Sequence, residues 1–316
     1  MLAGLFEDEV GLAFRKGLKG LEKGAAAGRA ARYYRQLWDG LAQRQEFNRH
    51  AAVGDGLQDH WLERLLDQPN AFHRKAELAD PAKIGPALRE AYAAELDLFL
   101  GVLRADWAKA FRAAAPGLPP LSGFKPLEPL EASPAARARR DLKEALLRSG
   151  RRGADLAPEV AGHFRRNGLG LFGRYRAFRW DHASQSLRGV GAVDPIELSN
   201  LVGYDEQRRP LLDNVRAFVA GRPANNALLY GERGTGKSST VKALLNAHQE
   251  EGLRLVEVLS AHLMDFPAIL SHLRGRPEKF ILFVDDLSFE ENETAYKGLK
   301  AVLEGTLEAP PKNVIL

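Results

Sequence analysis

The chain has 316 residues, with 45 lysines and arginines, 41 acidic residues and no cysteine. This length predicts about two domains, each able to bury its own core. The lack of cysteine excludes a disulfide framework, thiolate zinc sites, iron–sulfur clusters and a cysteine nucleophile. No apolar run approaches the roughly 18 residues of a transmembrane helix, and the first residues have no signal-peptide pattern, so we expect a cytoplasmic protein that does not enter a membrane.

Positive charge is concentrated in the first part of the chain. Residues 1–194 carry 31 basic and 24 acidic side chains, whereas residues 195–316 carry 14 and 17. Within 164–180, arginines alternate with aromatic residues, namely Arg165, Arg166, Phe172, Arg174, Tyr175, Arg176, Phe178, Arg179 and Trp180. Such a segment can bind nucleic acid through phosphate contacts and base stacking. It can also pack the first half against an acidic C-terminal core. We favour packing, because the segment adjoins that core.

The first 190 residues predict a mainly α-helical N-terminal region. Over 1–112, apolar residues recur three or four positions apart, as in Tyr33, Tyr34, Leu37 and Leu41, and in Leu96, Leu98, Phe99 and Leu103. Six prolines in 113–135 predict an extended connector, because proline cannot donate the helical hydrogen bond. A further helix is expected at about 135–149. The loop at 190–196 marks the expected domain boundary.

Residues 191–316 predict an α/β domain. Apolar runs typical of strands occur at 227–230, 253–259, 280–284 and 313–316, with helical stretches between them, including 292–308. This alternation is typical of a parallel sheet with right-handed crossovers. Asp265 is expected to cap one of the helices, with Pro267 in its first turn.

A phosphate-binding loop is the most specific motif. Gly231-Glu-Arg-Gly-Thr-Gly-Lys-Ser238 matches GxxxxGK[ST] between an expected strand and an expected helix. Glycines let successive N–H groups turn toward phosphate oxygens, and the helix directs its positive end to the same anion. We expect Lys237 to contact the β- and γ-phosphates during catalysis, and the Ser238 hydroxyl to bind Mg²⁺. The expected phosphate-binding residues are Gly231, Glu232, Arg233, Gly234, Thr235, Gly236, Lys237, Ser238 and Ser239.

Two acidic residues complete the expected nucleotide site. Asp285 and Asp286 follow the apolar run 280–284, about 50 residues after the phosphate loop. The carboxyl ends of parallel strands face the crevice in which α/β proteins bind ligands. We therefore expect Asp285 to hold Mg²⁺ and Asp286 to orient or deprotonate the attacking water.

The segment Leu201-Val-Gly-Tyr204-Asp-Glu-Gln precedes a helix upstream of the first strand. Here the chain resembles the AAA+ ATPases, and the resemblance implies that Val202, Gly203 and Tyr204 line the adenine pocket. An ordinary helix start capped by Asp205 is the alternative. The runs IELSNLVGYDEQ, GRPANNALLYGERGTGKSSTVKALLN and KFILFVDDLSFE resemble a bacterial AAA+ group, domain of unknown function 815, over about 170–316. Membership implies binding of ATP with Mg²⁺ and ATP hydrolysis, and supplies no established substrate.

The resemblance also implies a sensor residue, a trans-acting arginine and a helical lid beyond residue 316. We therefore expect a truncated core that binds ATP, turns it over weakly and forms no stable ring, with homo-oligomers and an unidentified protein client for the full-length protein. The alternatives are a nucleotide-dependent switch without turnover and a DNA-associated loader or remodeller. The eight histidines show no metal-ligand spacing, so Mg²⁺ is the one metal expected. The lack of a guanine signature favours ATP over GTP.

Overall fold

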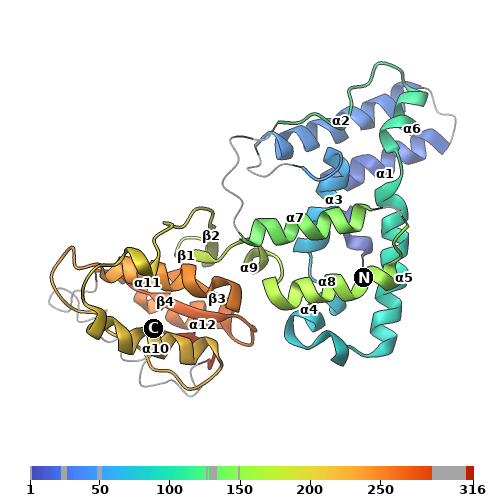
Figure 1. Cartoon of the computed structure of the whole chain (residues 1–316). Helices are drawn as coiled ribbons and strands as arrows, with labels where there is room; N and C mark the ends of the chain where they lie inside the picture. The colour runs from blue at the N-terminus through green and yellow to red at the C-terminus, as the bar shows by residue number, and fades with distance from the viewer. Residues whose placement is uncertain are drawn as a thin grey trace. The chain divides into compact units, whose positions relative to one another are not determined.

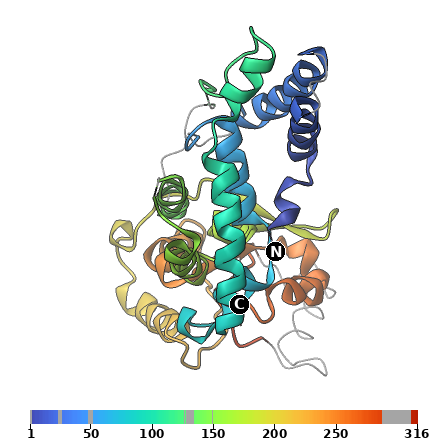
Figure 2. The same ribbon diagram turned by 90° about the vertical axis from the view of Figure 1, so that its right-hand side faces the viewer.

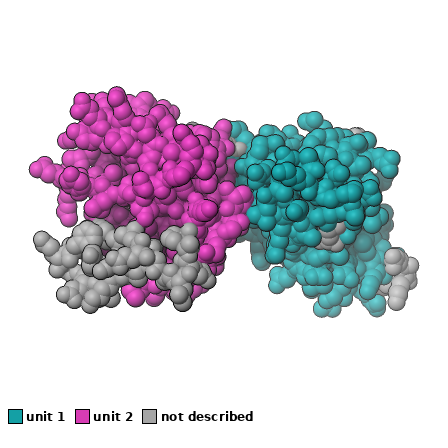
Figure 3. Space-filling view, turned by 90° about the horizontal axis from the view of Figure 1, so that it is seen from below, with its two compact units in different colours: residues 1–173 teal, residues 174–316 magenta. Residues whose placement is uncertain are grey.

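The chain forms two compact units, Met1–Gly173 and Arg174–Leu316, in a computed structural model (Figure 3). The structure describes residues 2–22, 27–47, 52–125, 127, 134–148, 150–286 and 311–316. The helix expected over 292–308 lies outside these residues. Of the helices that the structure describes, none has the length and apolarity needed to cross a bilayer.

The described part of the first unit is helical, as the sequence predicts. Its α-helices are α1 (Glu9–Glu22), α2 (Ala27–Gln45), α3 (Gly56–Asp67), α4 (Ala71–Leu78), α5 (Pro86–Arg104), α6 (Trp107–Ala114), α7 (Pro134–Leu147) and α8 (Gly153–Asn167). The short helices η1 (Ala3–Phe6) and η2 (Pro81–Lys83) precede α1 and α5, and α9 (Leu171–Arg174) lies at the boundary between the units. α1 packs beside α2, and α5 packs beside α8 (Figures 1 and 2).

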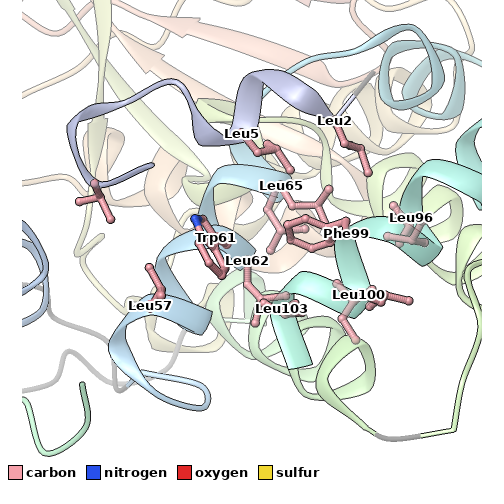
Figure 4. Close-up of a cluster of buried hydrophobic side chains, with 14 of the residues drawn as sticks. Leu2, Leu5, Leu57, Trp61, Leu62, Leu65, Leu96, Phe99, Leu100 and Leu103 are labelled. Carbon is pink, nitrogen blue, oxygen red and sulfur yellow. The ribbon is translucent and has the colours of Figure 1, made fainter. Parts of the chain in front are cut away.

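The core of the first unit gathers side chains from α3, α5 and the N-terminus (Figure 4). Trp61 of α3 is fully buried, and the rings of Phe6 and Phe14 meet it edge-on at centroid distances of 5.2 and 4.8 Å. The expected stripe on α5 is confirmed for its members Leu96, Phe99 and Leu103, which are buried. Leu98 is 74% exposed, because a turn of about 100° per residue places it away from this stripe.

A five-stranded sheet forms the described core of the second unit, in the order β2-β1-β3-β4-β5. The strands are β1 (Ala177–Asp181), β2 (Ser186–Val190), β3 (Leu253–Glu257), β4 (Lys279–Phe283) and β5 (Val314–Ile315). β1, β3, β4 and β5 run parallel, and β2 pairs antiparallel with β1. The α/β fold with a mostly parallel sheet is thus confirmed.

The boundary between the units lies earlier than the sequence suggests. We expected residues up to 190 to belong to the helical region, but 177–190 form the β1–β2 hairpin of the C-terminal sheet. β1 supplies the neighbour that β3 needs on one side, and its side chains Phe178 and Trp180 are buried. Arginine alternates with aromatic residues in this segment, and side chains of a strand point alternately to its two faces, so the pattern has the period of a strand.

Helices cover both faces of the sheet (Figure 1). α10 (Asp205–Val219) and α11 (Lys237–His248) place Phe218 and Leu244 against Leu255 and Ile281 of the sheet. α12 (Phe266–Leu273) packs on the other face, where the ring of its His272 lies 5.7 Å from that of Trp180. The short helices η3 (Leu198–Asn200), η4 (Gln249–Glu251) and η5 (Ser260–Asp265) precede α10, β3 and α12.

The strand expected at 227–230, before the phosphate loop, is not formed. Ala227 N–H donates to the Leu316 carbonyl at 2.9 Å, and Leu316 N–H donates to Asn226 Oδ1 at 2.9 Å. The segment therefore starts beside β5, but β5 contains two residues, so its ladder offers few backbone partners. Leu228 and Tyr230 are consequently exposed, at 65% and 90%.

Candidate functional site

The motif 231–238 forms a loop that turns directly into α11. Gly234 and Gly236 have φ angles of 80° and 81°, which residues with side chains rarely adopt. Gly236 is the residue that precedes the helix, so no side chain caps its start. The first N–H groups of α11 are therefore available to an anion. The loop thus combines left-handed glycines with an uncapped helix start, two features that a phosphate-binding loop uses.

The ammonium group of Lys237 lies across this loop. Lys237 is the first residue of α11, and its Nζ donates to the carbonyls of Gly231 and Glu232 at 2.9 and 2.8 Å. Thr235 Oγ1 donates to the same Glu232 carbonyl at 2.9 Å. The side chain thus folds back over the loop, and its positive charge lies among the residues expected to bind phosphate.

Ser238 and Asp285 meet, although 47 positions separate them in the sequence. Ser238 Oγ donates to Asp285 Oδ2 at 2.8 Å. Ser238 lies in the first turn of α11, and Asp285 follows β4 by two residues. A hydroxyl and a carboxylate are oxygen ligands of the kind that Mg²⁺ prefers. The two residues expected to hold Mg²⁺ therefore fit such an ion in chemistry and in position.

Asp286 occupies an unusual backbone conformation next to this pair. Its φ is 50°, in the left-handed region that is costly for a residue with a side chain. Its N–H donates to Asp285 Oδ1 at 3.1 Å, so the strained residue orients the other oxygen of the Asp285 carboxylate. Strain of this kind concentrates at functional sites, which is consistent with the role expected for Asp286.

The residues expected to line the adenine pocket lie in an exposed segment of the chain. Val202 and Tyr204 are 92% and 57% exposed, and Gly203 has a φ of 76°. Leu201 is the residue of this segment that approaches the loop, since its Cδ2 lies 4.0 Å from the position of a Cβ added to Gly236. Leu201 was not among the residues expected, because the resemblance implies a role only for the three residues that follow it, Val202, Gly203 and Tyr204.

Asparagine side chains of α10 and α11 bind the backbone of two segments that precede the loop in the chain. Asn246 of α11 donates from Nδ2 to the carbonyls of Asp194 and Ile196, both at 2.9 Å. Asn214 of α10 exchanges two hydrogen bonds with the backbone of Asn225, at 2.8 and 2.9 Å. The sequence gives no sign of these roles, because bonds from side chains to distant backbone groups have no characteristic spacing.

The arginine-rich segment belongs to the second unit from Arg174 onward. Arg176 is buried, and its burial lowers its pKa to about 10 against the opposing effect of Glu278 and Glu250. Arg179 Nε donates to Glu257 Oε2 of β3 at 2.6 Å. Arg176 thus lies buried next to β1, whereas the Arg179 side chain is 62% exposed and pairs with the neighbouring strand. The packing occurs within the sheet itself, whereas we expected the segment to join the helical region to it.

Comparison with known proteins agrees with this division of the chain. Residues 173–316 match the model of the family described as "Protein of unknown function (DUF815)". The match begins at the unit boundary and covers β1, the phosphate loop and Asp285. Searches of curated proteins and of solved structures found no match.

Proposed function

We propose, from the match of residues 173–316 to the DUF815 family model and from the geometry of the loop, that the second unit is an ATP-binding domain of AAA+ type. It binds ATP with Mg²⁺, hydrolyses the bond between the β- and γ-phosphates, and uses the energy to remodel a protein partner. The protein acts as a homo-oligomer in this proposal, as AAA+ proteins do.

The contact between Ser238 and Asp285 carries the proposal. A glycine-rich turn alone can arise without a ligand, and an acidic residue often ends a strand. The Ser238 hydroxyl comes from α11 and the Asp285 carboxylate from the end of β4. The fold places these two groups 2.8 Å apart. Between them they offer oxygen ligands next to a loop whose backbone suits phosphate. This combination is typical of nucleoside triphosphate sites.

Each residue has a defined part in the proposed reaction. The open N–H groups at the start of α11 and the ammonium of Lys237 bind the phosphate oxygens and offset their charge. Ser238 and Asp285 hold Mg²⁺, which when bound supplies additional neutralisation of phosphate charge. Asp286 accepts a hydrogen bond from the attacking water and aligns it with the γ-phosphate. Val202, Gly203 and Tyr204 line the pocket for the base.

Binding and turnover are tested separately. A fluorescent ATP analogue, displaced by ATP or by GTP in the presence of Mg²⁺, measures binding to the 316-residue chain. We expect ATP to displace it at lower concentration than GTP, and Ser238→Ala to remove most of the affinity that Mg²⁺ adds. Failure of ATP to displace the analogue would contradict the proposal. Steady-state phosphate release then distinguishes a hydrolase from a switch, which would bind ATP without turnover.

A further inference from the structure

A second cluster of ligand side chains lies in the same unit, apart from the proposed nucleotide site. His182, His262 and Asp265 each place one ligand atom within 4.8 Å of the other two. His182 follows β1 in the hairpin turn, and the other two residues belong to η5, which follows β3. The sequence separates them by up to 83 positions, so no metal-binding spacing reveals the group. We expected Mg²⁺ to be the one metal of this chain, so this group was not predicted.

We propose that His182, His262 and Asp265 form a binding site for a divalent transition metal of the zinc type. Two imidazoles and one carboxylate are ligands that Zn²⁺ prefers, whereas Mg²⁺ and Ca²⁺ favour oxygen ligands alone. Three protein ligands leave a fourth position for water. The inference does not depend on the proposed ATP site.

The ligands are already close to each other. His182 Nδ1 lies 2.6 Å from Asp265 Oδ2, and the rings of His182 and His262 have centroids 4.5 Å apart. Two ligand atoms of a tetrahedral Zn²⁺ lie roughly 3.3 Å apart, given bond lengths of about 2.0–2.1 Å. Small side-chain rotations therefore suffice to admit the ion. Such proximity reduces the entropy that binding would otherwise cost.

Asp265 is held in place by a residue outside the ligand set. Trp180 Nε1 donates to Asp265 Oδ2 at 2.7 Å, and Trp180 is buried. Hydrogen bonds of this kind orient metal-binding carboxylates. Asp265 precedes α12 as the sequence predicts, yet its side chain makes no capping bond to that helix. Its carboxylate is directed instead to Trp180 and His182, where it is positioned for a metal.

The turn that carries His182 is also fixed. Gln185 adopts a φ of 48°, and its Nε2 donates to the His182 carbonyl at 2.9 Å. Bound metal would therefore connect two chain segments, the β1–β2 turn and η5, at the carboxyl ends of adjacent parallel strands. We expect the metal to stabilise the second unit, since a ligand that binds only the folded state raises its stability.

Zinc titration of the untagged 316-residue chain, after removal of metals with a chelator, tests the site. A competing colorimetric indicator measures the affinity, and Co²⁺ in place of Zn²⁺ gives an absorption spectrum that reports nitrogen and oxygen ligands. We expect one Zn²⁺ per chain and at least tenfold weaker binding by His262→Ala. His248→Ala serves as the matched control, because this histidine lies on α11 and pairs with Glu251.

Circular dichroism checks that each variant is folded. If His262→Ala does not fold, His182→Ala replaces it, because that side chain is 58% exposed and its loss leaves the core intact. Equal zinc affinity in the wild type and in the folded cluster variant would overturn the site, and so would absence of binding in the wild type. Lys237→Ala should bind zinc normally, so failure of the ATP proposal would leave this result unaffected.

Discussion

Buried polar residues in the first unit have partners that determine their protonation. His73 is fully buried, with Nδ1 at 3.0 Å from the Gln68 carbonyl and Nε2 at 2.9 Å from the Tyr92 hydroxyl. A carbonyl can only accept, so Nδ1 carries the proton and Nε2 accepts from Tyr92. Burial lowers the pKa of His73 to about 4, although the bond to Gln68 opposes this effect. His73 is therefore neutral at physiological pH.

This protonation state predicts how the stability of the first unit depends on pH. Between pH 6.5 and about 4, the unfolded chain protonates His73 while the folded unit does not. The free energy of unfolding should therefore fall as the pH decreases through this range, by on the order of 3 kcal/mol from this residue. Urea unfolding at several pH values measures the effect. His73→Gln keeps a donor and an acceptor but does not titrate, so its free energy of unfolding should depend less on pH over this range. An unchanged pH dependence in this variant would refute the neutral state of His73.

At the scale of elements, repeating patterns made the helices and most strands predictable. Apolar spacing predicted α5, and the continuous apolar run at 280–284 predicted β4. β1 was missed because its alternation of arginine with aromatic residues also suits a binding surface. The phosphate loop and its contact with Asp285 were predictable, because a motif and a strand end define them. The bonds from Asn246 to the carbonyls of Asp194 and Ile196 are tertiary contacts that no local pattern contains.

Phe178 tests whether β1 is part of the core of the second unit. Its side chain is 1% exposed, although it lies in the segment considered for nucleic-acid contact. Removal of a buried phenylalanine ring costs about 3–5 kcal/mol. Phe178→Ala should therefore lower the melting temperature of the second unit by several degrees. Leu98→Ala, at an exposed position of α5, is the control and should leave the melting curve unchanged. Identical melting curves for Phe178→Ala and wild type would contradict the placement of β1 in the core of the second unit.

At the scale of the whole molecule, each unit buries its own hydrophobic side chains within the part of the chain that the structure describes. The proposed ATP and zinc sites both consist of residues from the second unit. A ligand that binds one folded unit stabilises that unit directly. The first unit contains His73 and its buried partners, and neither proposed site draws on its residues.

Calorimetric unfolding should therefore show two transitions that respond to different changes. Mg·ATP and Zn²⁺ should raise the transition temperature of the second unit. Phe178→Ala should lower the temperature of this same transition. Acidification from pH 6.5 should lower the transition temperature of the first unit, which contains His73. A single transition that shifts as a whole under every one of these changes would show that the two cores unfold together, contrary to this prediction.

The central claim, that residues 231–238 bind the phosphates of ATP, is tested most directly by calorimetric titration of Mg·ATP into three forms of the chain. Lys237→Ala removes the ammonium that lies across the loop. Lys242→Ala removes a lysine of the same helix whose Nζ lies 3.7 Å from Asp194. Hydrogen bonds to charged groups contribute about 1.5–3 kcal/mol, so Lys237→Ala should bind at least tenfold more weakly than wild type, and Lys242→Ala should bind equally well. Equal affinity of Lys237→Ala and wild type would contradict the phosphate-loop assignment.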